Sequence, residues 1–302
     1  MNDQEFKEKY DKLKNSKFYQ QKMIGWRPLP TISCITIIFV CFAVFFIIMG
    51  IIILVFTAQV KEIKYKYYPL EKYPNGNNII LNINEDMKKP VMIYYQIDGI
   101  IQNHRFYMDS KSDKQLKGEE VSLDDLKKDK ICESALTVGE IKYWPGYEGD
   151  NSDDNELAEP CGLIAKTYSF NDKFSDWRLD GEELNEEELE EEGIAYQSDI
   201  DTYEGFKDDE HFLVWMRPSP FSNPRKLYGR INIDIKQNSK LEVTYNNPNN
   251  YYGGSRYIIL STRNIFGGKS MFLGICYIIA GGLSLMASVI FITTYSSFHR
   301  KN

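Results

Sequence analysis

The residues Gly268-Lys269-Ser270 resemble the end of a phosphate-binding loop, in which backbone amides and a lysine hold the phosphates of a nucleotide. That chemistry requires a glycine five residues before the glycine of Gly-Lys-Ser, because the backbone must curl around the phosphates. Arg263 occupies this position, and a long apolar run follows the serine. The spacing therefore argues against a nucleotide site and favours a chain that enters a membrane here.

A second stretch that could do chemistry is residues 109–120, which resembles an EF-hand calcium loop. Acidic residues stand at its first, fifth and twelfth places: Asp109, Asp113 and Glu120. Lysines occupy the third place and the place of the required glycine, so a cation would lie beside the metal and the sharp turn would be missing. The sequence therefore does not predict calcium binding at this loop.

The remaining reactive residue types form no catalytic constellation. The three histidines, His104, His211 and His299, are far apart in sequence and none has a metal-ligand spacing. No Gly-x-Ser-x-Gly elbow is present, and basic residues outside the apolar runs are not clustered with stacking aromatics. We expect no catalytic residue, no cofactor, no metal and no nucleic-acid partner.

Two long apolar runs stand near the ends of the chain. Residues 32–58 and 271–295 contain no charged residue, and about 20 helical residues cross the hydrocarbon core of a bilayer. The first run is too long and too far from the start for a cleavable signal peptide. The sequence predicts tails at 1–31 and 296–302, transmembrane helices at 32–58 and 271–295, and one large domain at 59–270.

Charge favours an orientation with both termini in the cytoplasm. The first 30 residues carry seven Lys or Arg and four Asp or Glu, and Arg300 and Lys301 follow the second span. Between them remain 27 basic and 39 acidic residues of a chain with net charge −7. Positive residues prefer the cytoplasmic side, although lysines directly after the first span weaken this signal.

The cysteines give a further indication of compartment. Three of the five cysteines lie within the predicted spans, and only Cys132 and Cys161 belong to the central domain. An even pair in a domain outside the cytoplasm indicates a disulfide, which would stabilise the fold by about 3–4 kcal/mol by closing a loop of roughly 30 residues. Two free buried thiols are the alternative.

The central domain is rich in predicted strands. Apolar and β-branched runs bounded by Asn, Gly and Pro predict strands at residues 91–98, 212–217, 227–235, 240–247 and 256–262. The fold class expected is a membrane protein whose two transmembrane helices flank an antiparallel, β-sandwich-like domain with long loops. The acidic stretch 180–192 is predicted to be a solvated loop or a short exposed helix.

Small residues of the second span lie on one side of the predicted helix. They recur four or seven apart: Gly274, Cys276, Ala280, Gly281, Ser284 and Ser288. Small side chains allow another helix to approach closely, so this face is a candidate for packing against a partner. The alternative is packing against the first span, where Ala43 and Gly50 form a sparser small face.

Six ordered blocks of the chain resemble the cell division control protein 50 family, the accessory subunits of type IV P-type ATPase phospholipid flippases. The blocks run along nearly the whole chain: "FYQQKMIGWRPLPT", "YYQIDGIIQNHRFYMDSKSDKQL", "EPCGLIAKTYSFND", "EEGIAYQSD", "FLVWMRPSPFSNPRKLYGRI" and "LSTRNIFGGKSMFLGICYIIAG". The resemblance implies two spans with cytoplasmic termini, a β-rich exoplasmic domain, and a disulfide between Cys132 and Cys161 around the Pro-Cys-Gly segment.

The resemblance also implies the partner. Members of the family form a heterodimer with an ATPase that moves phospholipid to the cytoplasmic leaflet, and they act as chaperones for its folding and export from the endoplasmic reticulum. This chain would then reside in the endoplasmic reticulum, the Golgi or the plasma membrane, in contact with membrane lipids. A two-span ion-channel subunit is the alternative function.

The chain departs from the family at two places. Residues 70–90 lack the further cysteines that are common there, and the central domain contains no Asn-x-Ser/Thr sequence for glycosylation.

The Gly-Lys-Ser of the first motif falls in the last block. Gly267, Gly268 and Lys269 are expected to form a hinge where the last exoplasmic strand turns into the membrane, with the lysine among the headgroups.

Overall fold

The computed structural model describes residues 3–20, 22, 31–68, 78–132, 135–142, 154–168, 174–246 and 254–299. It contains two compact units, each of which is described by itself. One unit combines Met1–Ile52 with Phe272–Asn302, and the other is Ile53–Met271, called the β domain below.

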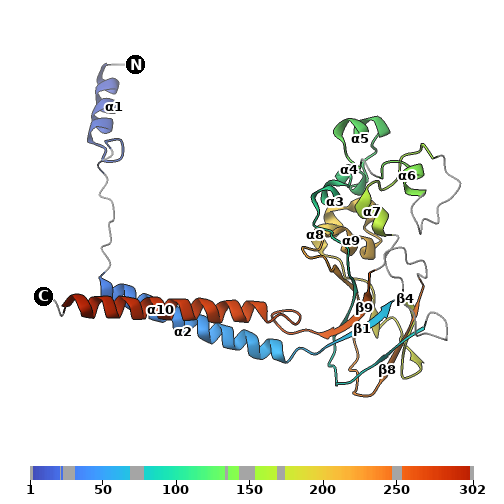
Figure 1. Ribbon diagram of the computed structural model, residues 1–302. Helices are drawn as coiled ribbons and strands as arrows, with labels where there is room; N and C mark the ends of the chain where they lie inside the picture. The colour runs from blue at the N-terminus through green and yellow to red at the C-terminus, as the bar shows by residue number, and fades with distance from the viewer. Residues whose placement is uncertain are drawn as a thin grey trace. The chain divides into compact units, whose positions relative to one another are not determined.

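The first unit contains most of one apolar helix, all of the other and a shorter terminal helix. Helix α2 (Ile32–Ala58) and helix α10 (Phe272–His299) are long and apolar enough to cross a membrane. Most of their large apolar side chains are exposed, which suits helices surrounded by lipid rather than by a protein core. Helix α1 (Asp3–Asn15) precedes them (Figure 1).

The β domain contains two sheets in which every strand pair is antiparallel. One sheet has the strand order β1-β9-β3-β7-β6, and the other has the order β2-β8-β4-β5. The strands are β1 (Glu62–Tyr68), β2 (Asn78–Asn82), β3 (Val91–Ile97), β4 (Phe174–Leu179), β5 (Glu182–Glu183), β6 (Leu189–Glu190), β7 (Arg225–Ile231), β8 (Lys240–Tyr245) and β9 (Arg256–Thr262).

One hydrophobic cluster joins the inner faces of both sheets. Alternate residues of each strand point into it, as Ile79 and Leu81 of β2 and Leu241 and Val243 of β8 do. The ring of Tyr67 in β1 lies 5.2 Å from the ring of Tyr245 in β8 and so bridges the two sheets. The predicted antiparallel sandwich is therefore confirmed.

Short helices lie to one side of the two sheets (Figure 1). They come from the long connections between the strands. Their bounds are α3 (Arg105–Asp109), α4 (Asp113–Leu116), α5 (Leu123–Asp129), α6 (Val138–Lys142), α7 (Leu163–Tyr168), α8 (Gln197–Thr202), the 3-10 helix η1 (Glu204–Phe206) and α9 (Glu210–Met216).

Four of the five predicted strands are confirmed, and the fifth prediction is wrong. Of residues 212–217, expected as a strand, residues 212–216 belong to helix α9 and Arg217 directly follows its end. The buried residues Phe212, Leu213, Trp215 and Met216 recur with helical spacing, so they share one face of a helix. The Asp209 carboxylate accepts a hydrogen bond from the Phe212 amide at 2.9 Å and caps the helix start.

The acidic stretch 180–192 contains strands rather than a helix. Asp180 and Gly181, both with positive φ, form the tight turn between β4 and β5. Leu184 and Leu189 pack against the core and fix the stretch to the domain, while most of its carboxylates stay exposed.

The conformation of residues 70–90 could not be predicted from the sequence. Of these, residues 78–90 contain β2 and a bridge between Met87 and Ile235. Residues 69–77 lie outside the described residues.

The cap of α9 generates a first prediction. Asp209→Ala removes the acceptor for the Phe212 amide and for the Tyr168 hydroxyl, and loss of the cap alone lowers the free energy of unfolding by about 1 kcal/mol. Thermal unfolding of the purified full chain in detergent measures this loss. Asp208→Ala, at the exposed residue next to it, is the matched control. An equal loss of stability in both variants would contradict the capping role.

Candidate functional site

The expected disulfide is present in the β domain. Cys132 and Cys161 are bonded, with a Cα–Cα distance of 5.9 Å, and both are buried. They form a small second core with Leu126, Leu136 and Ala158, apart from the core of the sandwich. The bond therefore holds together loops and short helices that have little apolar surface of their own.

The block "SKSDKQL" packs directly against the Pro-Cys-Gly segment. The Ser110 hydroxyl accepts a hydrogen bond from the Leu163 amide at 2.9 Å, and the Gln115 side chain accepts from the Cys161 amide at 3.0 Å. Gly162 has a φ of +108°, and a Cβ there would collide with the Ser110 carbonyl oxygen. Residues that are 46 and 53 positions apart in sequence thus hold these two blocks together.

The block "GIAY" is held by a single carboxylate from α9. Glu210 accepts hydrogen bonds from the amides of Gly193, Ile194 and Ala195 at 2.9, 2.6 and 2.8 Å. Burial by itself would raise the pKa of Glu210, but the three amide hydrogen bonds outweigh it and the pKa is lowered. Glu210 therefore stays ionised and fixes this segment beside α9.

Lys226 of β7 joins the strand to the other end of α9. Its ammonium group donates hydrogen bonds to the carbonyl oxygens of Val214 and Trp215, each at 3.2 Å, and to that of Arg217. These carbonyls lack helical partners because α9 ends at Met216, so a cation suits this position. Burial, and then the charge of Arg217, lower the pKa of Lys226 to about 7.

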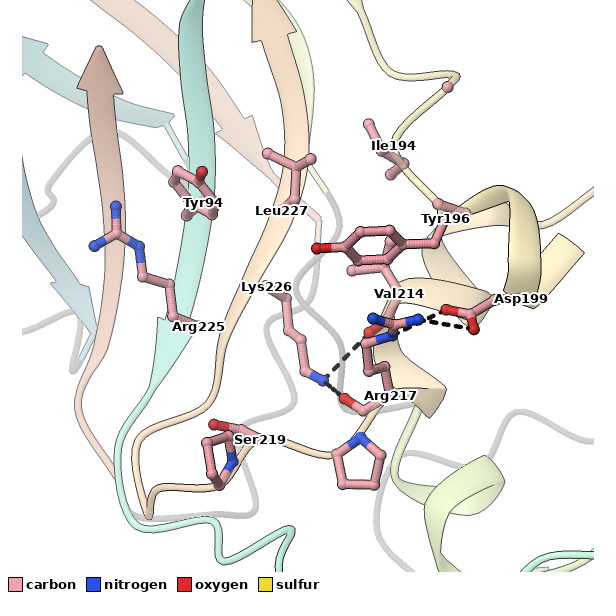
Figure 2. A pocket seen from close by; sticks show the side chains of 14 residues that line it. Tyr94, Ile194, Tyr196, Asp199, Val214, Arg217, Ser219, Arg225, Lys226 and Leu227 are labelled. Atoms are coloured by element: carbon pink, nitrogen blue, oxygen red, sulfur yellow. Dashed lines mark hydrogen bonds and ion pairs between the residues drawn. The ribbon is translucent and has the colours of Figure 1, made fainter. Parts of the chain in front are cut away.

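A cleft of about 500 Å³ opens beside Lys226, between the end of α9 and the sheet. Residues from three of the sequence blocks line it: Tyr94 of "YYQIDGIIQNHRFYMDSKSDKQL", the "GIAY" of "EEGIAYQSD", and residues of "VWMRPSP" and "RKL" in "FLVWMRPSPFSNPRKLYGRI". Leu227 lies between two walls, with Tyr94 and Arg225 on one side and Tyr196 and Arg217 on the other (Figure 2). The cleft thus combines an apolar centre with cationic and aromatic walls.

Each wall contains an arginine that stacks on a tyrosine. The Arg217 guanidinium lies 3.9 Å from the centre of the Tyr196 ring and makes two hydrogen bonds of 3.0 Å with Asp199. These hydrogen bonds raise the pKa of Arg217. The two Asp199 contacts hold the guanidinium in one orientation, so this wall is preorganised.

The opposite wall repeats the arrangement. The Arg225 guanidinium lies 4.3 Å from the centre of the Tyr94 ring and pairs with Glu62 at 2.9 Å. Burial raises the pKa of Tyr94 although the Arg225 charge opposes it, so the phenol is neutral at physiological pH.

Such a cleft can recognise a ligand, but among the described residues that line it no nucleophile is paired with a base. Within the described residues, no three His, Cys, Asp or Glu side chains form a metal-binding group.

The loop at the edge of the cleft is also fixed. The Ser219 amide donates a hydrogen bond to the buried Gln102 side chain at 3.0 Å, and the Asn103 amide group donates to the Pro220 carbonyl at 2.7 Å. Both partners come from the block "YYQIDGIIQNHRFY". The cleft therefore has a defined shape on both sides.

The small residues of the second span lie mainly against the first span. A Cβ at Gly281 would lie 3.2 Å from the Ala43 carbonyl oxygen, and one at Gly50 would lie 3.0 Å from that of Gly274. Gly274, Gly281 and Ser288 are buried in this contact. Cys276, Ala280 and Ser284 are only half-buried, and contact of this face with a partner stays a prediction.

A closed turn follows β9 and includes Gly267, the first of the predicted hinge residues. The Asn264 and Gly267 backbones exchange two hydrogen bonds of 2.9 and 3.0 Å, and Gly267 has a φ of +101° that favours glycine. A Cβ at Gly267 or Gly268 would meet no other atom among the described residues, so backbone conformation rather than space explains the first glycine. Thr57 donates to the Ser270 carbonyl at 3.4 Å, and the Phe56 ring contacts that of Phe266. The structure thus has a tight turn at this position, and the hinge stays a prediction.

The residues that form the cleft could not be identified from the sequence. Tyr94, Tyr196, Arg217, Arg225 and Lys226 occur in blocks that carried the resemblance, but no spacing rule joins them. The available signal was the presence of charged residues at the ends of apolar runs, in "VWMR" and "RKLY". Which of these charges would meet could be determined only from the fold.

Comparisons with known proteins agree with this architecture. Two apolar helices that flank an antiparallel β domain define a two-span membrane protein. The model of the LEM3 (ligand-effect modulator 3) family / CDC50 family matches residues 4–207 and 201–301. The chain belongs to this family.

Named relatives align along most of their length. The chain is 28% identical to ALA-interacting subunit 3 of Arabidopsis thaliana, with 93% of this chain and 86% of the relative covered. It is 29% identical to Cell cycle control protein 50A of Mus musculus, with 91% of this chain and 87% of the relative covered. The similarity therefore includes the spans and the β domain together.

The buried lysine generates a second prediction. An unfolded chain keeps Lys226 protonated up to about pH 10, whereas the folded chain releases this proton near pH 7. The unfolded state therefore binds more protons between these values, and stability rises with pH across this window. Unfolding temperatures at pH 6.5 and 9 should differ less in Lys226→Met than in the wild type. The exposed Lys236→Met is the control, and an unchanged pH dependence in Lys226→Met would contradict the assignment.

Proposed function

We propose that this chain is the non-catalytic accessory subunit of a phospholipid-transporting type IV P-type ATPase. The observation that carries the proposal is the match to one family along nearly the whole chain, including relatives that are named for interaction with a partner. The cleft supports a role in binding, since its charged side chains are paired and oriented rather than arranged for bond cleavage.

The subunit would act on the partner by folding with it. Two apolar helices that already pack on each other present a preformed surface to the helices of a larger membrane protein. A rigid β domain can cover loops of the partner and bury polar groups that would otherwise be exposed during its assembly. These contacts would support the partner's folding, its export from the endoplasmic reticulum and phospholipid translocation.

The proposed orientation places both termini in the cytoplasm and the β domain on the exoplasmic side. The Cys132–Cys161 disulfide supports this orientation, because disulfides persist in the oxidising lumen of the secretory pathway and are rare in the cytosol. The basic residues before the first span and after the second favour the same orientation.

Engineered glycosylation sequences test the orientation. Glu187→Thr makes exposed Asn185 an acceptor in the β domain, and Lys17→Thr does the same for Asn15 in the N-terminal tail. After expression in eukaryotic cells, only the Glu187→Thr chain should migrate more slowly and be restored by endoglycosidase. A glycan on the Lys17→Thr chain would contradict the cytoplasmic tail.

Purification with the partner tests the function itself. An affinity tag on the chain, with extraction in mild detergent, should recover a P-type ATPase, and phospholipid transport by that ATPase should fall when the chain is depleted. The competing function is a two-span ion-channel subunit. Recovery of only self-associated chains that conduct ions would contradict the proposal and support the channel.

A further inference from the structure

The edge of β7 beside the cleft has no strand partner from Arg225 to Leu227 among the described residues. On one side β7 pairs with β3 from Arg225 to Ile231, but on the other side β6 pairs only at Arg230 and Ile231. Glu190 and Glu191 also lie beside Gly229, so the open part of the edge is the part that lines the cleft. In the part of the chain that the structure describes, no strand pairs with this edge of β7 after β6 ends. The cleft lies between residues 193–196 and residues 225–227 (Figure 2).

Arg217 and Arg225 are the cationic groups in the cleft lining that can face a ligand, because Lys226 donates its hydrogen bonds to carbonyl oxygens of the chain itself. Asp199 in the same lining pairs with Arg217. Glu62 adds a second carboxylate from outside the lining, paired with Arg225. Both arginine side chains remain partly exposed, at 48% and 31%. Each guanidinium therefore keeps N–H groups free to bind an acidic group within the cleft.

From this combination of a free strand edge, an apolar centre and two arginine walls, we propose that the cleft binds an extended, acidic peptide segment of the ATPase partner. The segment would lie along β7, where its backbone can use the open strand edge. Its carboxylates would contact Arg217 and Arg225, and its apolar side chains would cover Leu227. The inference rests on the proposed function for the identity of the partner.

The geometry favours a peptide over a phosphate group. A phosphate is bound best by cations that converge on one point, whereas Arg217 and Arg225 lie in opposite walls and each already pairs with a carboxylate. Lys226 donates its hydrogen bonds to three carbonyl oxygens of the chain itself. An extended strand instead presents alternate side chains to one face at regular intervals, which suits two separated arginines.

A labelled peptide tests the cleft directly. The full chain, purified in detergent, is titrated against a rhodamine-labelled Gly-Asp-Thr-Val-Thr-Asp peptide, whose Asp, Val and Asp side chains share one face of an extended strand, and against the same peptide with Lys in place of Asp. Fluorescence anisotropy should show at least tenfold tighter binding of the acidic peptide, and added salt should weaken it. Equal binding of the two peptides would overturn the proposal.

Variants of the cleft identify the binding residues. The pair Arg217→Gln and Arg225→Gln removes both charges with little change of shape, and Leu227→Trp fills the centre while keeping the charges. Both changes should weaken binding of the acidic peptide at least tenfold, whereas Lys236→Gln on the exposed surface should leave it unchanged. Unchanged unfolding temperatures verify that the variants are folded. Retained peptide affinity in both folded cleft variants would overturn the proposal.

Two further measurements separate the possible failures. If glycerophosphoserine displaces the peptide at lower concentration than unlabelled peptide does, and binds the double Gln variant less tightly, the cleft is a headgroup site and the inference fails. If the wild type recovers the ATPase and both cleft variants recover as much, the inference fails while the proposed function stands. If the wild type recovers no ATPase, the proposed function fails whatever the peptide binding.

Discussion

The pairing of the first strand with the last brings the two ends of the β domain together. The Thr262 amide donates to the Lys61 carbonyl at 2.9 Å, and the Lys61 amide donates to the Thr262 hydroxyl at 2.9 Å, across 201 residues of sequence. β1 follows α2 almost directly, and β9 ends shortly before α10. The two connections of the β domain therefore leave from adjacent strands at one end of one sheet.

The pairing of β1 with β9 also limits where the remaining strands of this sheet can lie. Once β1 and β9 are neighbours, β3 covers the other side of β9, and β7 continues the sheet toward the cleft. The long connections are then free to fold into short helices, which carry little core of their own and are held by specific bonds. Glu210 and Lys226 fix the two ends of α9, and the disulfide fixes the small cluster around Cys161.

The parts of the fold that could be predicted from sequence are those with a local signal. The uncharged runs of the two spans and the alternating residues of β8 depend only on neighbouring residues, so the patterns were sufficient. Residues 212–217 were misread because a short apolar run does not distinguish a buried helix from a strand, and the deciding feature was the cap at Asp209. The disulfide was predictable because only two cysteines of the central domain were available to pair.

The cleft could not be predicted because its residues meet only through long-range contacts. Tyr94 and Arg225 belong to different strands, and their contact follows from the register between β3 and β7, which shifts between Ile93 and Tyr94. Tyr196 reaches the opposite wall because Glu210 binds the three amides before it. The resemblance of the blocks was visible in sequence, but that three of them meet at one cleft follows only from the fold.

Cysteine cross-linking of β1 to β9 tests their pairing most directly. Lys66 and Tyr257 are register partners on these strands, so Lys66→Cys with Tyr257→Cys should form a disulfide in cells. Lys64→Cys with Tyr257→Cys, offset by two residues, should cross-link far less. The cross-linked chain should still recover the ATPase. Failure of the register pair to cross-link, or exclusion of the cross-linked chain from the complex, would contradict this pairing.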